Sequence, residues 1–410
     1  MTVITPFRAI RPTRDKAYLV ATRPFYAYNK TVLQAKLEHN PYTFLHVINP
    51  EFHTDDKTEP NTPERYQKVR NKFDEFLREG ILIQDQKACF YLYRQTIEGH
   101  EYTGIIGGAS VDEYNEGRIK KHEETLTDRE EMFSHFLKIV EFNVEPVLLF
   151  HQRNEDLIKL YALIMLDRPE YEFSSWDKGK HELWVVEDKT LINKIEQCFD
   201  KMKDIYIADG HHRCSSSARH SLTNDHKTSP FQDQFLACYI AEDRMKIYDY
   251  NRLVKDLNGL SSADFIEQIA ESFLVTKIRN EDAAPFGLHE ISMYLDGQWY
   301  KLTAKEGTFD RLHPVYRLDT DILTKNILAP VLNISDLRTD TRIFFIDGRA
   351  GMAGIKDAVD EGKATVGFGL FPVSIEHLKK VADEGLIMPP KSTWIEPKIR
   401  SGLTIFPLDA

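Results

Sequence analysis

The residues best suited to chemistry stand in one block, residues 207–213, which reads IADGHHR. A buried strand pattern ends in Asp209, and Gly210 leads into a helical pattern that begins with His211. The N–H groups and positive end of a helix attract anions, and glycine lets a ligand approach the backbone closely. The junction therefore predicts a phosphate site. The alternative interpretation is a capped helix start that carries surface histidines.

Each side chain of this block has a role that its chemistry allows. Arg213 can clamp two phosphate oxygens at once. His211 and His212 can donate hydrogen bonds or move a proton near neutral pH. Asp209 can fix the tautomer of a histidine or bind a metal ion, here Mg²⁺.

A second block, residues 117–129 (GRIKKHEETLTDR), mixes cations with paired acids ahead of an amphipathic helix. A glutamate of the pair can act as a general base, and the lysines can bind phosphate. The candidates are Lys120, Lys121, His122, Glu123 and Glu124. The alternative is a solvated charged turn with a capping box, because Thr127 precedes Glu130 at the spacing of that motif.

The third block is residues 388–402, MPPKSTWIEPKIRSG, which holds three basic residues and one acidic residue. Lysine, arginine and hydroxyl side chains suit an anion, and Trp394 offers a flat face to a substrate. The candidate phosphate ligands are Lys391, Ser392, Thr393, Lys398 and Arg400. A structured tail packed by the tryptophan and its prolines is an equal alternative.

The fourth block joins FRAIRP at residues 7–12 with NPYTFLHV at residues 40–47. Arg8 and Arg11 can reach the same anionic pocket, and His46 is a candidate contact to the substrate. Salt bridges between these arginines and the acidic remainder of the chain are at least as good an interpretation.

These blocks must be positioned by alternating strand and helix patterns, which are typical of an α/β or α+β fold. Helical spacing over 66–77 and 191–202 flanks apolar strand patterns at 89–97, 144–151 and 205–209. We expect a core region at 1–255, a smaller α+β subdomain at 256–335, and a C-terminal region at 336–410 that returns to the core.

Charge and composition narrow the function. The 410 residues carry a net charge of −11, whereas residues 1–30 hold six basic residues and one acidic residue. An acidic chain is a poor general binder of nucleic acid. No apolar run is long enough for a membrane span. The prolines at 6, 12 and 24 argue against a transit peptide. Four dispersed cysteines without a CxxC pair argue against a structural zinc site and against a disulfide framework. They indicate reduced thiols and a cytoplasmic protein.

Familiar cofactor and nucleophile motifs are missing from the sequence. It contains no GxxxxGK[ST] loop, no GxGxxG after a strand, no GxSxG and no HExxH. A P-loop nucleotidase, a Rossmann dehydrogenase, an α/β-hydrolase and a zincin are therefore unsupported.

Together the blocks resemble the domain of unknown function 1015 family, whose pattern runs PFRAxRP, NPxSFLxV, GxIxxHExT, IADGHHR and MPPKSTxFxPKxxSG. The matching stretches here are residues 6–12, 40–47, 117–125, 207–213 and 388–402, so the resemblance spans nearly the whole chain. One departure is TRPFY at 22–26, where the family more often has two prolines and Tyr-Asp.

The DGHHR block also resembles the nucleotide-binding motif of the ParB/sulfiredoxin-like fold, which implies a mixed-sheet core with phosphates at Gly210 to Arg213. Sulfiredoxin needs a thiol where His211 stands, and ParB proteins bind DNA, which the net charge disfavours. Free serine kinases carry DGHHR and use an upstream glutamate as base. By analogy with them, Glu123 takes that role.

The resemblance implies a small-molecule phosphotransferase, most concretely a kinase acting on free L-serine or a related hydroxy amino acid. ATP, ADP or pyrophosphate would be the donor, with Mg²⁺. Phosphoserine hydrolysis in the same pocket and a non-catalytic ParB-like nucleotide-binding or DNA-partitioning module are the alternatives. We also expect the N-terminal arginines and the C-terminal lysines to converge on one buried phosphate pocket.

Overall fold

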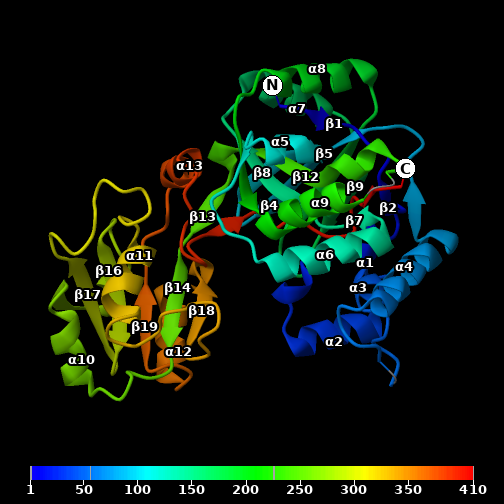
Figure 1. The fold of residues 1–410 in the computed structure, drawn as a ribbon. Coiled ribbons are helices and arrows are strands. Elements are labelled where there is room, and N and C mark those ends of the chain that lie inside the picture. The colour runs from blue at the N-terminus through cyan, green and yellow to red at the C-terminus, as the bar shows by residue number, and fades with distance from the viewer. Residues whose placement is uncertain (1, 56, 225–226, 410) are drawn as a thin grey trace. The chain divides into compact units, whose positions relative to one another are not determined.

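The computed structural model describes residues 2–55, 57–224 and 227–409, which form two compact units (Figure 1). The first unit contains residues 1–121, 125–245 and 397–410, and the second contains residues 122–124 and 246–396. The second unit is thus longer than the 256–335 segment expected from the sequence. Residues 336–396 belong to it because two of their strands complete its sheet, so only the last stretch of the chain returns to the first unit.

The first unit is built on a nine-stranded mixed sheet in the order β6-β11-β8-β12-β5-β4-β10-β9, with β1 paired to β5. The pairs β11–β6 and β12–β8 are parallel, and the other pairs are antiparallel. The mixed α/β fold class expected from the sequence is confirmed. The strands are β1 (Ile4–Thr5), β4 (Phe90–Ile97), β5 (His100–Ser110), β6 (Ile119–Lys120), β8 (Val147–His151), β9 (Tyr171–Ser174), β10 (Lys180–Val186), β11 (Ile205–Asp209) and β12 (Gln234–Ala241).

Helices pack against this sheet, and two small strand pairs extend the unit. The pairs are β2 (Ile10–Pro12) with β3 (Leu82–Gln84), and β7 (Phe142–Asn143) with β21 (Phe406–Pro407). The helices are α1 (Ala17–Val20), α2 (Lys30–His39), α3 (Leu45–Ile48), α4 (Pro63–Arg78), α5 (Val111–Asn115), α6 (Thr127–Val140), α7 (Glu155–Ile164), α8 (Lys189–Asp200) and α9 (His211–Thr223), with short 3₁₀ turns at Phe25–Ala27, Pro230–Asp233 and Glu242–Arg244. None of the helices described in either unit combines the length and the apolarity that crossing a bilayer requires.

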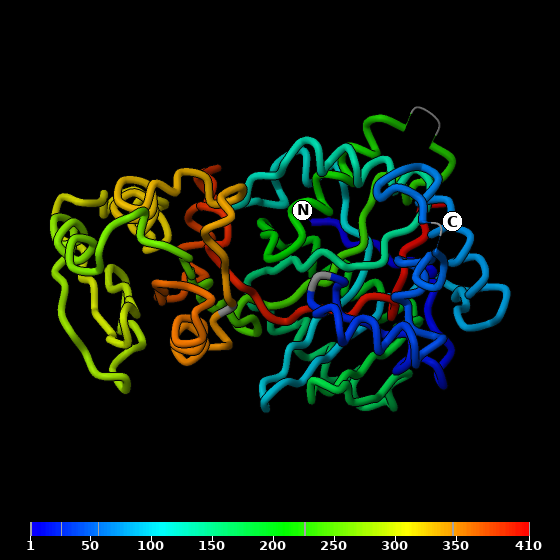
Figure 2. Tube along the Cα trace, turned by 90° about the horizontal axis from the view of Figure 1, so that it is seen from below, coloured from blue at the N-terminus to red at the C-terminus, as the bar shows by residue number. Residues whose placement is uncertain are grey.

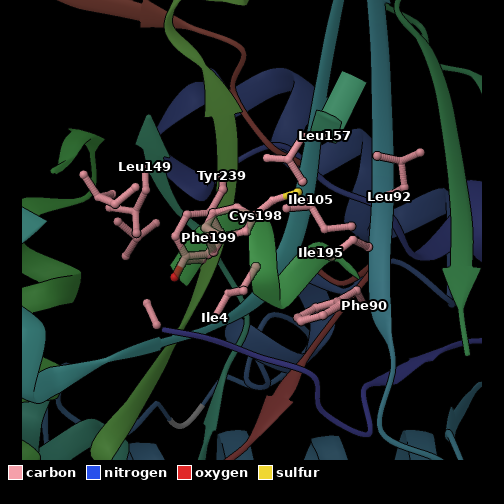
Figure 3. Packing of buried hydrophobic residues seen from close by; sticks show 14 of the residues in the cluster. Ile4, Phe90, Leu92, Ile105, Leu149, Leu157, Ile195, Cys198, Phe199 and Tyr239 are labelled. Atoms are coloured by element: carbon pink, nitrogen blue, oxygen red, sulfur yellow. The ribbon is translucent and has the colours of Figure 1, made fainter. Parts of the chain in front are cut away.

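The central strands are apolar at almost every position because both faces of the sheet are covered. On one face, side chains such as Leu149 and Tyr239 pack against Leu157 of α7 and against Ile195 and Phe199 of α8 (Figure 3). These residues are at most 1% exposed. Burial of this kind stabilises the fold by roughly 25 cal/mol per Å² of apolar area.

The opposite face of the sheet is covered by the two ends of the chain. Backbone bridges join Ile10 to Ile405 and Thr22 to Ser401, and the rings of Phe7 and Phe406 lie 4.7 Å apart. Figure 2 shows the red C-terminal segment running beside the blue N-terminal segments in this unit. These bridges hold residues 401–405 beside the N-terminal segments, and Lys398, from the end of the third sequence block, reaches Asp209 of β11.

The second unit contains a six-stranded antiparallel sheet in the order β15-β17-β16-β19-β14-β18 and a separate pair, β13 with β20. The strands are β13 (Lys246–Tyr248), β14 (Tyr250–Val254), β15 (Phe273–Ile278), β16 (Glu290–Leu295), β17 (Gln298–Ala304), β18 (Ile343–Asp347), β19 (Val366–Gly369) and β20 (Trp394–Glu396). The helices are α10 (Ser262–Ile269), α11 (Asp319–Leu323), α12 (Gly351–Asp360) and α13 (Ile375–Asp383), with a π-helical turn at Thr324–Leu328 and 3₁₀ turns at Asn280–Asp282 and Gly348–Ala350.

The start of α6 differs from the capping box that the sequence indicates. Leu126 is the N-cap and its side chain caps nothing, while Thr127 is already helical. The hydroxyl of Thr125 contacts the carboxylate of Glu130 instead. A side-chain contact two residues earlier than expected therefore holds this helix start.

Candidate functional site

The junction between β11 and α9 turns the chain from a buried strand directly into a helix. Gly210 is the N-cap of α9 and has φ of +105°, in the left-handed region that favours glycine. Its carbonyl accepts hydrogen bonds from the backbone N–H groups of Arg213 and Cys214 at 2.8 and 3.1 Å. The glycine thus starts the helix at once, and the side chains of the first turn stay next to Asp209.

Two cations meet on the carboxylate of Asp209. The Nη2 group of Arg213 donates to Oδ2 at 2.8 Å, and Nζ of Lys398 donates to Oδ1 at 3.0 Å. Burial alone would raise the pKa of Asp209, but the charges of Lys398 and Arg213 hold this pKa well below its ordinary value. Asp209 is therefore ionised at neutral pH and positions both cations.

A small pocket lies around this triad within the first unit. Arg213 also donates through Nη1 to the carbonyl of Pro146 at 2.6 Å, and the Oε2 atom of Glu145 lies 3.9 Å from the same nitrogen. The pocket is lined by Pro24, Glu145, Pro146, Leu148, Asp209, Arg213, Pro397, Lys398 and Ile399. Its free volume is about 10 Å³, the space of roughly one water molecule. A phosphate can enter only if Arg213 or Lys398 moves.

The pocket also offers oxygen ligands of the kind that Mg²⁺ prefers, the carboxylates of Asp209 and Glu145. Both oxygens of Asp209 are held by cations, and Oε1 of Glu145 accepts from the hydroxyl of Ser401 at 3.1 Å. Asp209 and Glu145 could therefore bind a metal ion only after an anion had taken Arg213 and Lys398 away from Asp209.

The two histidines occupy the first turn of α9. His211 is buried and His212 is half-buried. The carbonyl of His212 accepts hydrogen bonds from the hydroxyls of Ser215 and Ser216, which are buried in the next turn. The serine run after the DGHHR block thus packs this helix start into the unit.

The N-terminal arginines do not line this pocket, which corrects the expectation that all the basic blocks converge there. Arg11 is buried, donates through Nε to Asp85 at 2.9 Å, and contacts Glu170 through Nη1 at 3.1 Å. Arg8 is exposed and lines a different hollow beside Glu141. For Arg11, the alternative of a salt bridge to the acidic part of the chain is therefore correct, because its guanidinium binds Asp85 and Glu170.

His46 likewise has a local partner. Its ring is buried, and Nε2 lies 3.1 Å from the carbonyl of Asn40. Burial lowers the pKa of His46. Lys121, of the second sequence block, is exposed and has its ammonium group 5.9 Å from the ring of Tyr114.

Arg400 lies outside the Asp209 pocket and in a second buried network of the same unit. Its Nη2 donates to both oxygens of Asp177, at 2.7 and 2.8 Å, and to the hydroxyl of Ser175 at 3.0 Å. Nε of Arg400 donates to Nε2 of His181 at 3.3 Å, and Nδ1 of His181 lies 2.6 Å from the hydroxyl of Tyr93. Opposing burial, the charge of Arg400 lowers the pKa of Asp177 to about 2.

This network predicts a pH-dependent stability. Burial, helped by the charge of Arg400, lowers the pKa of His181 to about 3, whereas an unfolded histidine has a pKa of about 6.5. Between these values the unfolded chain binds more protons, so the free energy of unfolding falls as pH falls, by up to about 1.4 kcal/mol per pH unit. We expect His181→Gln to flatten this slope in urea unfolding between about pH 7 and pH 4. His39→Gln, at an exposed site on α2, should not; an unchanged slope in His181→Gln would contradict the assignment.

The other predicted residues belong to the second unit. Lys391 places its ammonium group 5.3 Å from the ring of Tyr250, which contacts Trp394 edge-on at 5.6 Å. Ser392 is buried and donates to the carbonyl of Pro389 at 2.7 Å, while the neighbouring Thr393 is half-buried. Of the third sequence block, residues 388–396 therefore belong to the second unit, whereas Lys398 and Arg400 belong to the first.

The segment that carries Glu123 is fixed within the second unit by its neighbours. The carbonyl of His122 accepts a hydrogen bond from the backbone N–H of Met388 at 2.9 Å, and Glu124 pairs with Arg338 at 3.3 Å. His122 is buried and Glu123 half-buried. Glu123, the predicted base, therefore stands on a held backbone rather than on a loose turn.

Several residues of the two networks escape sequence reasoning. Glu145 and Pro146 lie just before β8, and Asp177 and His181 border the β9–β10 turn. None of these four residues stands in a sequence motif.

Residues 4–321 match the family described as "Protein of unknown function (DUF1015)". The chain belongs to this family. No curated protein matches the chain. Among solved structures, one similar chain is a free serine kinase variant in complex with AMP, at 12% identity and a TM-score of 0.39, covering 73% of this chain and 91% of that one.

Two other similar structures cover comparable shares of the chain. SbnI with a C-terminal truncation, from Staphylococcus aureus, has 13% identity and a TM-score of 0.41, covering 74% of this chain and 87% of that one. A conserved hypothetical protein from Pyrococcus furiosus has 14% identity and a TM-score of 0.38, covering 75% and 96%. Scores this low carry no inference about activity, which must come from the residues themselves.

Proposed function

We propose that this chain is a small-molecule phosphotransferase, a kinase that phosphorylates the hydroxyl group of free L-serine or a related hydroxy amino acid. One observation carries the proposal. Arg213 and Lys398 are both held on Asp209, beside the glycine that opens α9. Phosphoryl transfer needs cations and backbone donors that are fixed before the charge develops, and this junction supplies both.

The donor phosphates bind by replacing Asp209 as the partner of the two cations. A phosphate carries more charge than a carboxylate, and arginine binds it through two parallel hydrogen bonds. The N–H groups at the start of α9 add to the attraction. Since the closed pocket holds about one water, this exchange of partners is also what opens the site to ATP, ADP or pyrophosphate.

Magnesium has a place in this exchange. Once the phosphate takes the arginine and the lysine, the carboxylates of Asp209 and Glu145 are the residues that would hold Mg²⁺. The ion would neutralise charge on the donor phosphates. In the same step His211 or His212 donates a hydrogen bond to the transferred group.

The acceptor hydroxyl must lose its proton as its oxygen attacks phosphorus. We assign this proton to the carboxylate of Glu123, while the bond from phosphorus to the leaving oxygen breaks and that oxygen keeps the electron pair. The DGHHR resemblance to free serine kinases, which use an upstream glutamate as base, supports this assignment.

The test is direct incubation. Purified protein with Mg²⁺, L-serine and one of ATP, ADP or pyrophosphate should yield phosphoserine, detected by mass spectrometry. Glu123→Gln should lower the rate by roughly 10²- to 10⁴-fold, the usual contribution of a general base. Glu124→Gln is the matched control, since this neighbour is exposed and paired with Arg338.

Two outcomes would contradict the proposal. The first is that no donor yields product. The second is that Glu123→Gln and Glu124→Gln form phosphoserine at the same rate, which would show that Glu123 does not accept the proton of the serine hydroxyl. Incubation with phosphoserine alone asks whether the same pocket catalyses hydrolysis instead.

A further inference from the structure

A second cavity of the first unit is separate from the Asp209 pocket and has a volume of about 420 Å³. This lies within the range of small-molecule sites, roughly 300 to 1,000 Å³. Its walls come from α1, one side of α2, the β9–β10 turn and Arg400. Its aromatic and cationic lining residues include Tyr18, Tyr28, Lys36, Phe173, Trp176 and Arg400.

Helix α2 shows that the cavity is not a packing defect. Only Leu37 of its ten residues is buried. Thr31, Val32, Ala35 and Lys36 follow one another at helical spacing and line the cavity, so they form one face of the helix. A helix normally buries such a face against protein; here that face is the wall of an open space.

The cavity is positively charged. The lining side chains include Lys36 and Arg400 but no carboxylate. Asp177 behind the wall neutralises only one of these charges, and Nε of Arg23 also lies 4.0 Å from Asp177. Burial and the charge of Arg400 both lower the pKa of Lys36, which shows that the two cations act on one another. An anion placed between them would relieve this repulsion.

Arg400 still has a donor to offer. The side chain of Arg400 is only 4% exposed, and its Nε and Nη2 groups donate to His181, Ser175 and Asp177. Among the residues that the structure describes, none accepts a hydrogen bond from Nη1. A buried, rigidly held cation whose Nη1 has no acceptor among the described residues is well suited to bind an anionic oxygen.

The mouth of the cavity carries exposed aromatic rings. Tyr18 is 53% exposed and Trp176 is 54% exposed. Phe173 meets Tyr18 edge-on at 5.9 Å and extends the apolar wall inward. Aromatic faces of this kind bind flat rings by stacking, so the charge and the rings point to one class of ligand.

We propose that this cavity binds a small organic anion with a flat ring, whose carboxylate or phosphate lies between Lys36 and Arg400 and whose ring packs among Tyr18, Phe173 and Trp176. The site is additional to the proposed phosphotransfer site and does not depend on it. The shared chemistry, an anionic head on a planar body, is found both in nucleotides and in aromatic carboxylic acids.

Calorimetric titration with AMP and with indole-3-acetate separates these two sources. At least one should bind, and Lys36→Gln should weaken that binding by about tenfold, as expected for a lost charged hydrogen bond. Trp176→Ala should weaken binding by roughly two- to tenfold through lost stacking. Lys30→Gln, at an exposed site on the same helix, is the matched control.

A second measurement locates the ligand without relying on affinity. The bound probe should slow acetylation of Lys36 by acetic anhydride and leave Lys30 unaffected, as read by peptide mass mapping. If neither probe binds at about 1 mM, or if Lys36→Gln and Lys30→Gln weaken binding equally, the proposal fails. AMP binding that depends on Arg213 and not on Lys36 would place AMP at the start of α9. If indole-3-acetate then also fails to bind, the cavity proposal is overturned, whereas the phosphotransfer proposal stands.

Discussion

Replacing Arg213 with glutamine should lower the rate of phosphoserine formation by roughly a hundredfold to a thousandfold, the usual cost of one preorganised charged donor. Arg213 is fixed by Asp209 at 2.8 Å and by the Pro146 carbonyl at 2.6 Å before any ligand arrives. Because Arg213 binds the donor phosphates in the proposed site, its loss should lower donor affinity as well as kcat. Lys398→Gln should also lower the rate of phosphoserine formation.

The control for this variant stands on the same helix. Arg219 is partly exposed and pairs with Glu131, two turns beyond the DGHHR block. Arg219→Gln should keep the activity within about twofold, since exposed ion pairs contribute little. Melting temperatures of both variants separate a lost phosphate ligand from lost stability. Activity that falls equally in both, or in neither, would show that Arg213 binds no phosphate.

The structural features that could be predicted from the sequence are those determined by residues close together in the chain. Strand β11, the glycine and the start of α9 are adjacent in sequence, so periodicity and residue type were sufficient to predict them. The helix predicted over 191–202 is α8, Lys189–Asp200, and its N-cap Asp188 accepts from the N–H of Leu191. The mixed α/β class follows from the same local patterns.

The parts that could not be predicted depend on partners far along the chain. Lys398 and Lys391 stand in one motif and have equal charge, yet Lys398 meets Asp209 whereas Lys391 belongs to the second unit and lies over Tyr250. The ion pair of Arg11 could not be predicted, because its partner Asp85 lies 74 residues away and stands in no motif. The sequence therefore predicts Arg11 in the phosphate pocket, which is wrong. Composition indicates that a charge will be paired but does not identify the partner.

Replacing Gly210 with alanine should reduce both stability and donor binding, by separable mechanisms. The left-handed backbone costs a residue with a Cβ atom about 1 to 2 kcal/mol. The new Cβ would also lie 3.0 Å from the Cζ, Nε and Nη2 atoms of Arg213. The guanidinium would have to shift by a few tenths of an ångström, away from the position in which it donates to Asp209 at 2.8 Å. We expect ADP affinity, measured by calorimetry, to fall by about tenfold or more.

Gly80→Ala isolates the backbone contribution. Gly80 follows α4, has φ of +66°, and would place its Cβ in open space. It should therefore lose a similar amount of stability in urea unfolding, yet keep its affinity for ADP. If both variants bind ADP equally well, the position of Arg213 over the helix start does not govern the donor site. If only Gly210→Ala loses affinity for ADP, Gly210 supports ADP binding by leaving space for the side chain of Arg213.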